Sequence, residues 1–291
     1  MSKSVTILID SLEEVLDSFD VAVLDQWGVL HNGSTCYPSA SDAMKILHGN
    51  GKEIFILSNS RKRADLNFKR IEKMGLPVET ISQVVTSGEA LWQDVNESRV
   101  HVAGQTPKCF YPICAHPDDP GIWAAGSDME IDPSCDTILL MGLLDDTGET
   151  EYDATFQQAL EFEIPLICSN PDKTSPRAER FVMSPGALAD RYEAMGGEVT
   201  WYGKPHTPVF EAIKRCQPEI APNRFLTVGD SLEHDIAGGQ NVGFKTAFVR
   251  RGIHASDFSN AALDDQINAT LRTLAEQHNI QPPDFSLGFL A

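Results

Sequence analysis

Short runs of Val, Ile and Leu alternate along this chain with longer segments in which apolar residues recur at helical spacing. A short apolar run bounded by polar residues is typical of a strand covered on both faces, as in a parallel sheet. Successive parallel strands need crossover helices, which the intervening segments can supply. The alternation therefore predicts an α/β fold around a mostly parallel sheet. The expected strands are residues 21–24, 54–57, 83–86, 100–103, 137–140, 166–169, 225–228 and 246–249, and the expected helices are residues 39–50, 61–74, 152–162, 187–195 and 208–216.

The middle of the chain differs from its two ends. Residues 105–134 hold five prolines and few regular patterns, but strand-like runs resume at residue 137 and again at residue 166. This pattern predicts a core domain built from both ends of the chain, with a second α/β domain inserted between them. We place the core at residues 1–87 plus 189–291 and the inserted domain at residues 88–188.

The charge balance limits the partners of the chain. Its 291 residues include 42 acidic and 23 basic side chains, a formal net charge of −19. Such a surface repels polyanions and lacks the basic footprint of a nucleic-acid-binding protein. The longest apolar stretch, residues 138–144, is too short to span a bilayer, and the N-terminus is unlike a secretory signal. We therefore expect a cytoplasmic protein with no nucleic-acid or membrane partner.

Two predicted strand ends in the first half carry side chains suited to phosphoryl chemistry. Ligands of open parallel sheets bind beyond the carboxyl ends of the strands. Asp25 follows the first buried run, and a carboxylate there can attack phosphorus as a nucleophile. Ser58 and Asn59 follow the second run, where a hydroxyl and the backbone amides of the next helix can bind phosphate. Taken singly, each feature is also typical of an ordinary turn or helix N-cap.

Two further motifs follow in the second half. Lys204 lies between Gly203 and Pro205, where a rigidly held ammonium can neutralise a carboxylate and a phosphoryl group. A lone lysine in a turn is more often a surface residue. Asp230 ends another buried run, and Asp235 follows it five residues later. Two carboxylates at this spacing supply the hard oxygen ligands that Mg²⁺ prefers, which predicts a magnesium site.

Asp25, Ser58, Lys204 and the Asp230–Asp235 pair occur in an order that resembles the four motifs of the haloacid dehalogenase superfamily. The sequence Asn-Pro-Asp at residues 170–172, inside the inserted segment, is similar to a cap loop of class IIA of that superfamily. This class includes p-nitrophenyl phosphatases, nucleotide phosphatases, pyridoxal phosphate phosphatases and sugar phosphatases. The resemblance extends from about residue 11 to residue 252, which leaves only the C-terminal tail uncovered.

The resemblance implies a Rossmann-like core with an inserted α/β cap of the kind that class IIA carries. It also implies transfer of a phosphoryl group from a small phosphorylated metabolite to a nucleophilic aspartate and then to water, with Mg²⁺ as cofactor. Caps of this class often mediate dimers, which leaves a homodimer open. The implied roles are Asp25 as nucleophile, Ser58, Asn59 and Lys204 as phosphate-binding residues, Asn170 and Asp172 as cap residues facing the substrate, and Asp25, Asp230, Asp235 and the backbone carbonyl of Trp27 as metal ligands.

One position departs from the pattern of these phosphatases. The residue two after the nucleophile is usually an Asp that protonates the leaving group and then activates water, but here it is Trp27, which has no acid–base function. General acid–base catalysis contributes about 10²–10⁴-fold, so its loss slows the departure of alkoxides more than that of phenolates or acyl groups. His31, His206 and His234 are candidates to replace it, and each is also consistent with a solvated surface histidine. The chain resembles a branch of class IIA that carries Trp at this position.

A magnesium-dependent phosphatase acting on a small phosphomonoester is the function that these residues favour. Trp27 keeps a second hypothesis open, a non-catalytic or weakly active phosphometabolite-binding protein. A dehalogenase also uses an Asp nucleophile, but its reaction needs no metal, whereas Asp230 and Asp235 suit one. A phosphomutase would again need an acid–base group where Trp27 stands.

Overall fold

The chain forms two compact units. The computed structural model describes residues 5–102, 104–115, 131, 134–176 and 180–291. The first unit, here called the core unit, comprises Met1–Ser58, Asn67–Val85 and Lys204–Ala291, and the second, the inserted unit, comprises Asn59–Leu66 and Thr86–Gly203. Much of the proline-rich segment at residues 105–134 lies outside the described residues.

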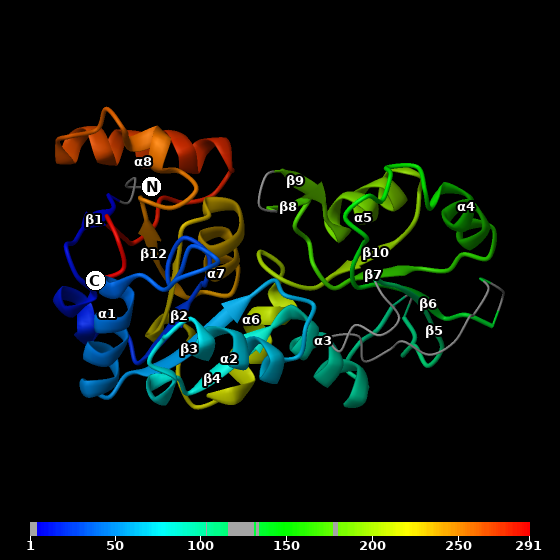
Figure 1. Cartoon of the computed structure of the whole chain (residues 1–291), viewed down its shortest axis with the longest axis horizontal. Helices are drawn as coiled ribbons and strands as arrows, with labels where there is room; N and C mark the ends of the chain where they lie inside the picture. The colour runs from blue at the N-terminus through cyan, green and yellow to red at the C-terminus, as the bar shows by residue number, and fades with distance from the viewer. Residues whose placement is uncertain (1–4, 103, 116–130, 132–133, 177–179) are drawn as a thin grey trace. The chain divides into compact units, whose positions relative to one another are not determined.

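A seven-stranded sheet forms the centre of the core unit, in the order β1-β13-β12-β11-β2-β3-β4 (Figure 1). β2 pairs in parallel with β11 on one side and with β3 on the other. Every residue of β2 and β11 is buried, which explains why both strands could be predicted from apolar runs in the sequence. The strands are β1 (Ile7–Leu8), β2 (Val21–Leu24), β3 (Glu53–Ser58), β4 (Gln83–Thr86), β11 (Phe225–Gly229), β12 (Lys245–Val249) and β13 (Phe285–Leu287).

Helices cover the core sheet. α6 shows why such segments are helical: it buries Val209, Phe210 and Ile213 at helical spacing, and Pro208 stands in its first turn, where a missing N–H costs nothing. α8 packs Leu271 and Leu274 into the same apolar cluster as Phe248 of β12. The helices are α1 (Pro38–Gly49), α2 (Ala64–Lys73), α6 (Thr207–Cys216), α7 (Ala237–Asn241) and α8 (Asp264–Gln277), joined by the short helical turns η1 (Leu12–Ser18), η2 (Val78–Thr80), η3 (Pro222–Arg224), η4 (Leu232–Ile236) and η5 (Ala255–Phe258).

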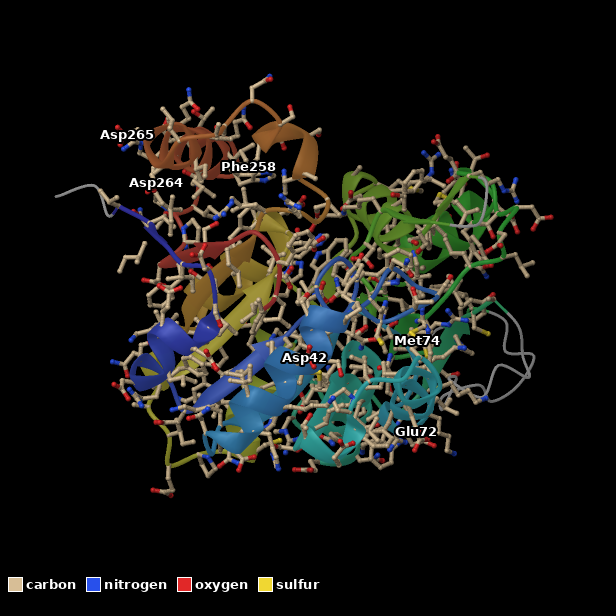
Figure 2. All side chains as sticks on the ribbon, turned by 60° about the vertical axis from the view of Figure 1, so that its left-hand side comes forward. Asp42, Glu72, Met74, Phe258, Asp264 and Asp265 are labelled. Carbon is tan, nitrogen blue, oxygen red and sulfur yellow. The ribbon has the colours of Figure 1, made fainter. Side chains whose placement is uncertain are left out.

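The outer faces of these helices carry much acidic charge. Asp42 of α1, Glu72 of α2, and Asp264 and Asp265 at the start of α8 are all exposed (Figure 2). This placement accords with a surface that repels polyanions. Within the described ranges, no helix is both long enough and apolar enough to cross a membrane.

The inserted unit has a parallel sheet of its own, in the order β10-β7-β6-β5, and a separate antiparallel hairpin. Its core includes Phe156 and Tyr192, whose ring centroids lie 4.9 Å apart. The Tyr192 hydroxyl donates to the carbonyl of Ile164 at 2.5 Å, which satisfies the one polar atom of that buried ring. The elements are α3 (Ser87–Asn96), β5 (Phe110–Ile113), β6 (Thr137–Leu140), α4 (Asp153–Glu161), β7 (Leu166–Cys168), β8 (Thr174–Pro176), β9 (Phe181–Met183), α5 (Pro185–Ala194) and β10 (Val199–Trp201).

The inserted unit extends further along the chain than the boundary predicted at residue 189. Leu188 and Tyr192 of α5 share one buried cluster with Leu166 of β7, and β10 pairs with β7, so the chain returns to the core unit only at Lys204. A three-residue, half-buried strand such as β10 offers no apolar run that could mark this extension.

The other predicted runs form strands, but the run at residues 100–103 does not. Val102 makes only an isolated bridge with Gln105, and residue 103 lies outside the part of the chain that the structure describes.

Candidate active site

Asp25 leaves the core sheet at its carboxyl edge, directly after β2. The parallel register pairs Leu24 with Val228 of β11 and with Ile56 of β3. The backbone N–H of Asp25 also donates to the carbonyl of Val228 at 2.9 Å. The segments that follow β11 and β3 therefore leave the sheet at the same edge as Asp25. The Asp25 side chain is 12% exposed, so it is accessible from solvent.

Lys204 joins two of the predicted site carboxylates. Its ammonium donates to Oδ1 of Asp25 at 2.5 Å and to Oδ1 of Asp235 at 2.7 Å. Burial alone would lower the pKa of Lys204, but the charges of Asp235 and Asp25 outweigh it and hold that pKa above its usual range. The ammonium therefore stays charged at any physiological pH and fixes the orientation of the Asp25 carboxylate.

Asp25, Asp230 and Asp235 together form a cluster that suits a cation. One oxygen from each carboxylate lies within 4.8 Å of the others. Burial raises the pKa of Asp230 and of Asp235, and the neighbouring Asp25 raises both further. Three carboxylates and the one Lys204 ammonium sum to a formal charge of −2, since −3 + 1 = −2. Such an excess is costly in a buried site unless a cation shares it, and these hard oxygen donors fit Mg²⁺.

Two loops approach Asp230 closely through glycines. The backbone N–H of Ile253 donates to Oδ2 of Asp230 at 2.9 Å. Gly28 has φ +75°, and a Cβ there would lie 1.9 Å from that oxygen, while a Cβ at Gly252 would lie 2.0 Å from it. Only glycine allows both backbones to come this close. The peptide that carries the Trp27 carbonyl therefore lies beside Asp230, and its role as a metal ligand stays a prediction.

A buried chain of hydrogen bonds fixes the loop after Asp25. Nε2 of Gln26 donates to Oδ1 of Asn67 on α2 at 2.8 Å, and Oε1 of Gln26 lies 3.4 Å from Nε2 of His31. Nδ1 of His31 accepts the backbone N–H of Gly33 at 3.0 Å. Burial, aided by the positive charge of Arg70, lowers the pKa of His31 to about 4. His31 is therefore neutral near pH 7 and engaged at both ring nitrogens, so it is not placed to replace the missing acid.

The other two candidate histidines lie close in sequence to site residues. His206 is partly buried at the start of α6, two residues after Lys204. His234 is partly buried in η4 next to Asp235, and its backbone N–H donates to the hydroxyl of Ser231 at 3.1 Å. Both therefore stay candidates for an acid–base group.

The remaining predicted residues fall in both units. Ser58 ends β3 in the core unit and is partly buried. In the inserted unit, Nδ2 of Asn59 donates to Oδ1 of Asp172 at 2.8 Å, and the Asp172 backbone N–H donates to Oδ1 of Asn170 at 2.9 Å. The structure thus brings Asn59, Asn170 and Asp172 together, while their predicted contacts with a substrate stay predictions.

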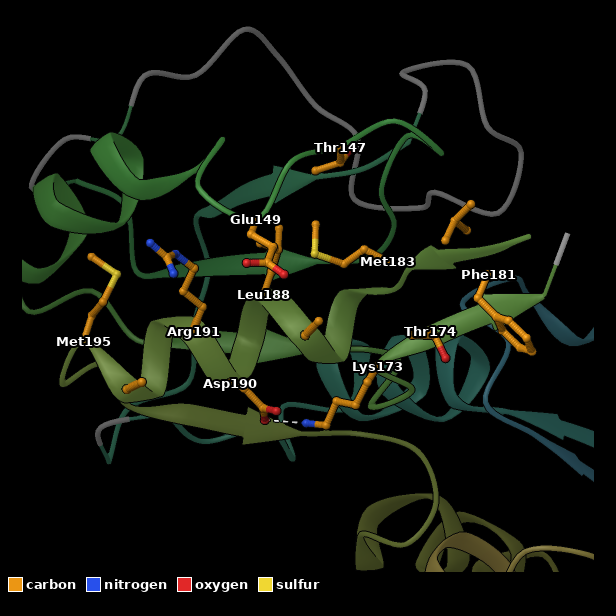
Figure 3. Close-up of a pocket in the computed structure, with 13 residues that line it drawn as sticks. Thr147, Glu149, Lys173, Thr174, Phe181, Met183, Leu188, Asp190, Arg191 and Met195 are labelled. Atoms are coloured by element: carbon orange, nitrogen blue, oxygen red, sulfur yellow. Dashed lines mark hydrogen bonds and ion pairs between the residues drawn. The ribbon is translucent and has the colours of Figure 1, made fainter. Parts of the chain in front are cut away.

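A cavity of about 650 Å³ lies in the inserted unit, between α5, the β8–β9 hairpin and the segment that follows β6 (Figure 3). Its surface is mainly apolar, with Met183 and Leu188 prominent in the view. Three of the charged side chains that line it are engaged, because Lys173 pairs with Asp190 within the lining and Arg191 pairs with Asp153 outside it. The lining includes none of the predicted site residues.

The sequence interpretation missed several residues that shape the site. Gly28 and Gly252 approach Asp230, and Gln26 and Asn67 anchor the loop. Glycine marks turns, so Gly28 and the Asn32-Gly33 pair could have indicated tight turns on both sides of His31. A buried amide pair gives no such signal, because Gln and Asn are mostly exposed residues in any sequence.

Comparison with known proteins places this arrangement in a family. The haloacid dehalogenase-like hydrolase model matches residues 22–110, and the HAD-hydrolase-like model matches residues 201–276. The chain is 27% identical to 4-nitrophenylphosphatase of Schizosaccharomyces pombe over 258 residues. This alignment covers 79% of this chain and 82% of that protein. It is also 27% identical over 288 residues to chronophin of Rattus norvegicus, covering 94% and 86% respectively.

Solved structures agree with the predicted fold. A haloacid dehalogenase-like hydrolase from Brucella suis superposes with a TM-score of 0.76 at 26% identity, covering 97% of this chain and 100% of that one. A p-nitrophenyl phosphatase from Archaeoglobus fulgidus gives a TM-score of 0.70 at 19% identity over 94% and 97% of the two chains, a likeness of fold alone. The predicted α/β fold, a Rossmann-like parallel-sheet core with an inserted α/β cap, is confirmed. The chain belongs to the haloacid dehalogenase-like hydrolases, on the branch that holds the class IIA phosphatases.

Proposed function

We propose that this chain is a Mg²⁺-dependent phosphatase that hydrolyses small phosphomonoesters through an aspartyl-phosphate on Asp25. The observation that carries the proposal is the ion pair of Lys204 with Asp25 inside a cluster of three carboxylates. Relatives named 4-nitrophenylphosphatase, chronophin and glycerol-3-phosphate phosphatase support phosphoester chemistry without choosing a substrate. The acidic surface favours a small phosphorylated metabolite over a polyanion. A cytoplasmic location and a homodimer stay predictions.

The first chemical step transfers the phosphoryl group to Asp25. Lys204 holds Oδ1 of this carboxylate, so Oδ2 is the oxygen that attacks phosphorus. The bond from phosphorus to the leaving oxygen breaks, and that oxygen keeps the electron pair. The Lys204 ammonium offsets the negative charge that the phosphoryl oxygens bring into the site. A Mg²⁺ held by Asp25, Asp230, Asp235 and the Trp27 carbonyl would supply Lewis-acid stabilisation of the same charge.

The second step restores the carboxylate. Water attacks phosphorus of the aspartyl-phosphate, the bond between phosphorus and the Asp25 oxygen breaks, and both water protons leave with inorganic phosphate. Trp27 donates no proton to the leaving group in the first step and takes none from water in the second. We therefore expect hydrolysis to be fastest for esters whose leaving oxygen is stable as an anion, and slow for alkyl phosphates.

A panel of phosphate esters tests the proposal. Purified protein is incubated with aryl, acyl and alkyl phosphates, with and without Mg²⁺, and released phosphate is measured. We expect Mg²⁺-dependent release that Asp25→Asn abolishes and that Asp42→Asn, which changes a carboxylate on the outer face of α1, leaves intact. Absence of metal-dependent release from every ester would refute a phosphatase.

A phosphometabolite-binding protein is the second candidate. It is favoured by Trp27 in the place of the acid and by His31, which the loop engages at both ring nitrogens. It predicts that phosphorylated ligands with Mg²⁺ raise the unfolding temperature while no phosphate is released. A dehalogenase is less consistent with the site, because carbon–halogen displacement does not require the cation that the carboxylate cluster fits.

A further inference from the structure

We propose that the indole of Trp27 is a platform on which an aromatic leaving group stacks, so that the site selects phosphate esters of hydroxyl groups on aromatic rings. This inference rests on the proposed phosphatase function of the site. It gives the residue that replaced the acid a role of its own in choosing the substrate.

Trp27 is unusual among the tryptophans that the structure describes. Its side chain is exposed, with 46% of its surface accessible. Trp92 and Trp201 are partly buried, and each carries a cation over its ring, Arg63 at 3.4 Å and Lys173 at 4.7 Å. No such cation covers the Trp27 ring among the described residues. Covering such an exposed apolar ring with a ligand is favourable, because it removes apolar surface from water.

The indole is held in place on the loop. Gly33 has φ +94°, and a Cβ there would lie 2.3 Å from Cζ2 of Trp27 and 2.5 Å from Cη2, so the six-membered ring rests on the Gly33 backbone. The His31 ring meets the indole edge-on, with centroids 6.0 Å apart and planes at 74°. His31 in turn is fixed by Gln26 and by the Gly33 N–H. A ring that is already fixed loses little conformational entropy when a ligand stacks on it.

The platform lies next to the reacting group. Trp27 is two residues after Asp25, so their Cα atoms are at most about 7 Å apart. The next residue, Gly28, places its backbone against Asp230. The indole therefore belongs to the segment that borders the carboxylate cluster, and the proposal requires its free face to meet a leaving group that departs from phosphorus at Asp25.

Two independent features of the loop select the same chemistry. If neither His206 nor His234 supplies the proton that Trp27 cannot give, the leaving oxygen departs as an anion, which aryl oxides and carboxylates do more readily than alkoxides. The indole face adds binding energy only for a leaving group that has a ring of its own. An aryl phosphate meets both conditions, an acyl phosphate meets the first alone, and an alkyl phosphate with a pendant ring meets the second alone.

Four esters separate these contributions in one experiment. Phenyl phosphate has a ring and a stable anion, acetyl phosphate has only the stable anion, benzyl phosphate has only the ring, and ethyl phosphate has neither. We expect Trp27→Ala to lower kcat/KM for phenyl phosphate about 3- to 10-fold, the range of aromatic pair energies, and to leave acetyl phosphate within about twofold. Trp27→Phe keeps a ring and should retain most of the phenyl phosphate activity.

Two controls guard against a loss of structure. Phe162 is 38% exposed at the C-terminal end of α4 in the inserted unit, so Phe162→Ala removes an exposed ring from outside the core unit that holds the carboxylate cluster. This variant should leave kcat/KM unchanged for both phenyl phosphate and acetyl phosphate. Binding is measured separately by calorimetry on the Asp25→Asn protein with Mg²⁺. There phenyl and benzyl phosphate should bind about 3- to 10-fold more tightly than ethyl phosphate, and Trp27→Ala should abolish the difference.

The outcomes separate the two proposals. If Trp27→Ala lowers phenyl and acetyl phosphate hydrolysis equally, or leaves phenyl phosphate unchanged, Trp27 is not a platform for the leaving group. If the wild-type protein hydrolyses none of the four esters, the phosphatase proposal fails instead. The calorimetric comparison then still shows whether the indole binds aromatic esters.

Discussion

Gly28→Ala tests whether the loop after Asp25 must touch Asp230 for the site to work. A Cβ at Gly28 would lie 1.9 Å from Oδ2 of Asp230, and ordinary contact begins at 3.4 Å, so the two must separate by 1.5 Å (3.4 − 1.9). A displacement of about 1 Å at a catalytic constellation can lower the rate about 10²-fold. The left-handed backbone at φ +75° adds about 1–2 kcal/mol of strain for any residue with a Cβ.

We therefore expect Gly28→Ala to lower kcat/KM about 10²-fold and to weaken Mg²⁺ binding, because the new methyl group pushes the Trp27–Gly28 peptide away from Asp230. Phosphate release measures the first effect and calorimetric titration with Mg²⁺ the second. Gly51→Ala is the matched control, since Gly51 has φ +71° and a Cβ added there would meet no atom within 4 Å. It should lose a similar free energy of unfolding, about 1–2 kcal/mol, with activity and Mg²⁺ affinity intact.

The comparison between these two glycines can refute the reasoning. If Gly28→Ala binds Mg²⁺ and releases phosphate as well as Gly51→Ala does, the close approach to Asp230 does not organise the site. If both variants lose activity to the same extent, backbone strain rather than the contact with Asp230 is responsible.

Three further perturbations test separate parts of the site. Lys204→Met removes the ammonium between two carboxylates and should lower kcat at least about 10²-fold, as phosphate release would show; unchanged turnover would contradict its role. Folding lowers the pKa of His31 from 6.5 to about 4, so the unfolded chain takes up this proton first as the pH falls. Between pH 6.5 and pH 4 the unfolding free energy of the wild type should therefore fall by about 3 kcal/mol more than that of His31→Asn, as urea titrations at each pH would show. Equal losses in the two proteins would disprove this. Asn59→Ala, Asp172→Ala and the double variant should show a coupling of about 1–2 kcal/mol in thermodynamic stability, whereas strictly additive effects would show that their hydrogen bond is not stabilising.

The closeness of Asp25 to Asp230 could be predicted because the parallel sheet brings residues that follow neighbouring strands to one edge. Asp25 and Asp230 each follow a buried run, and the parallel pairing of β2 with β11 brings the two strand ends to one edge. Sequence spacing could not show that Lys204 pairs with Asp235 as well as with Asp25, because that depends on side-chain distances across three segments of the chain. It likewise could not show that His31 is buried, since one histidine in a polar turn looks the same in sequence whether it faces solvent or the protein.

The inserted unit was harder to predict because its sheet edges lack continuous apolar runs. β5 contains Pro112, which argues against a central strand, but among the described residues β5 is the edge strand of its sheet, where proline is tolerated. β10 at the other edge is half-buried and three residues long. By contrast, β6 and β7 in the middle of this sheet are fully buried, and the sequence predicted both as strands. In this sheet, burial on both faces rather than strand propensity decided which strands the sequence could indicate.

Trp27, which stands where the resemblance to the phosphatases implies an Asp, is packed closely into its loop. The indole rests on Gly33, a position that tolerates no Cβ beneath the ring, and the same Gly33 donates its N–H to His31. His31 presents its ring to the edge of the indole and is tied through Gln26 to Asn67. An Asp in place of Trp27 would leave the Gly33 backbone and the His31 ring uncovered. The described contacts of the loop are therefore built around an indole, which is the arrangement that the proposed stacking platform requires.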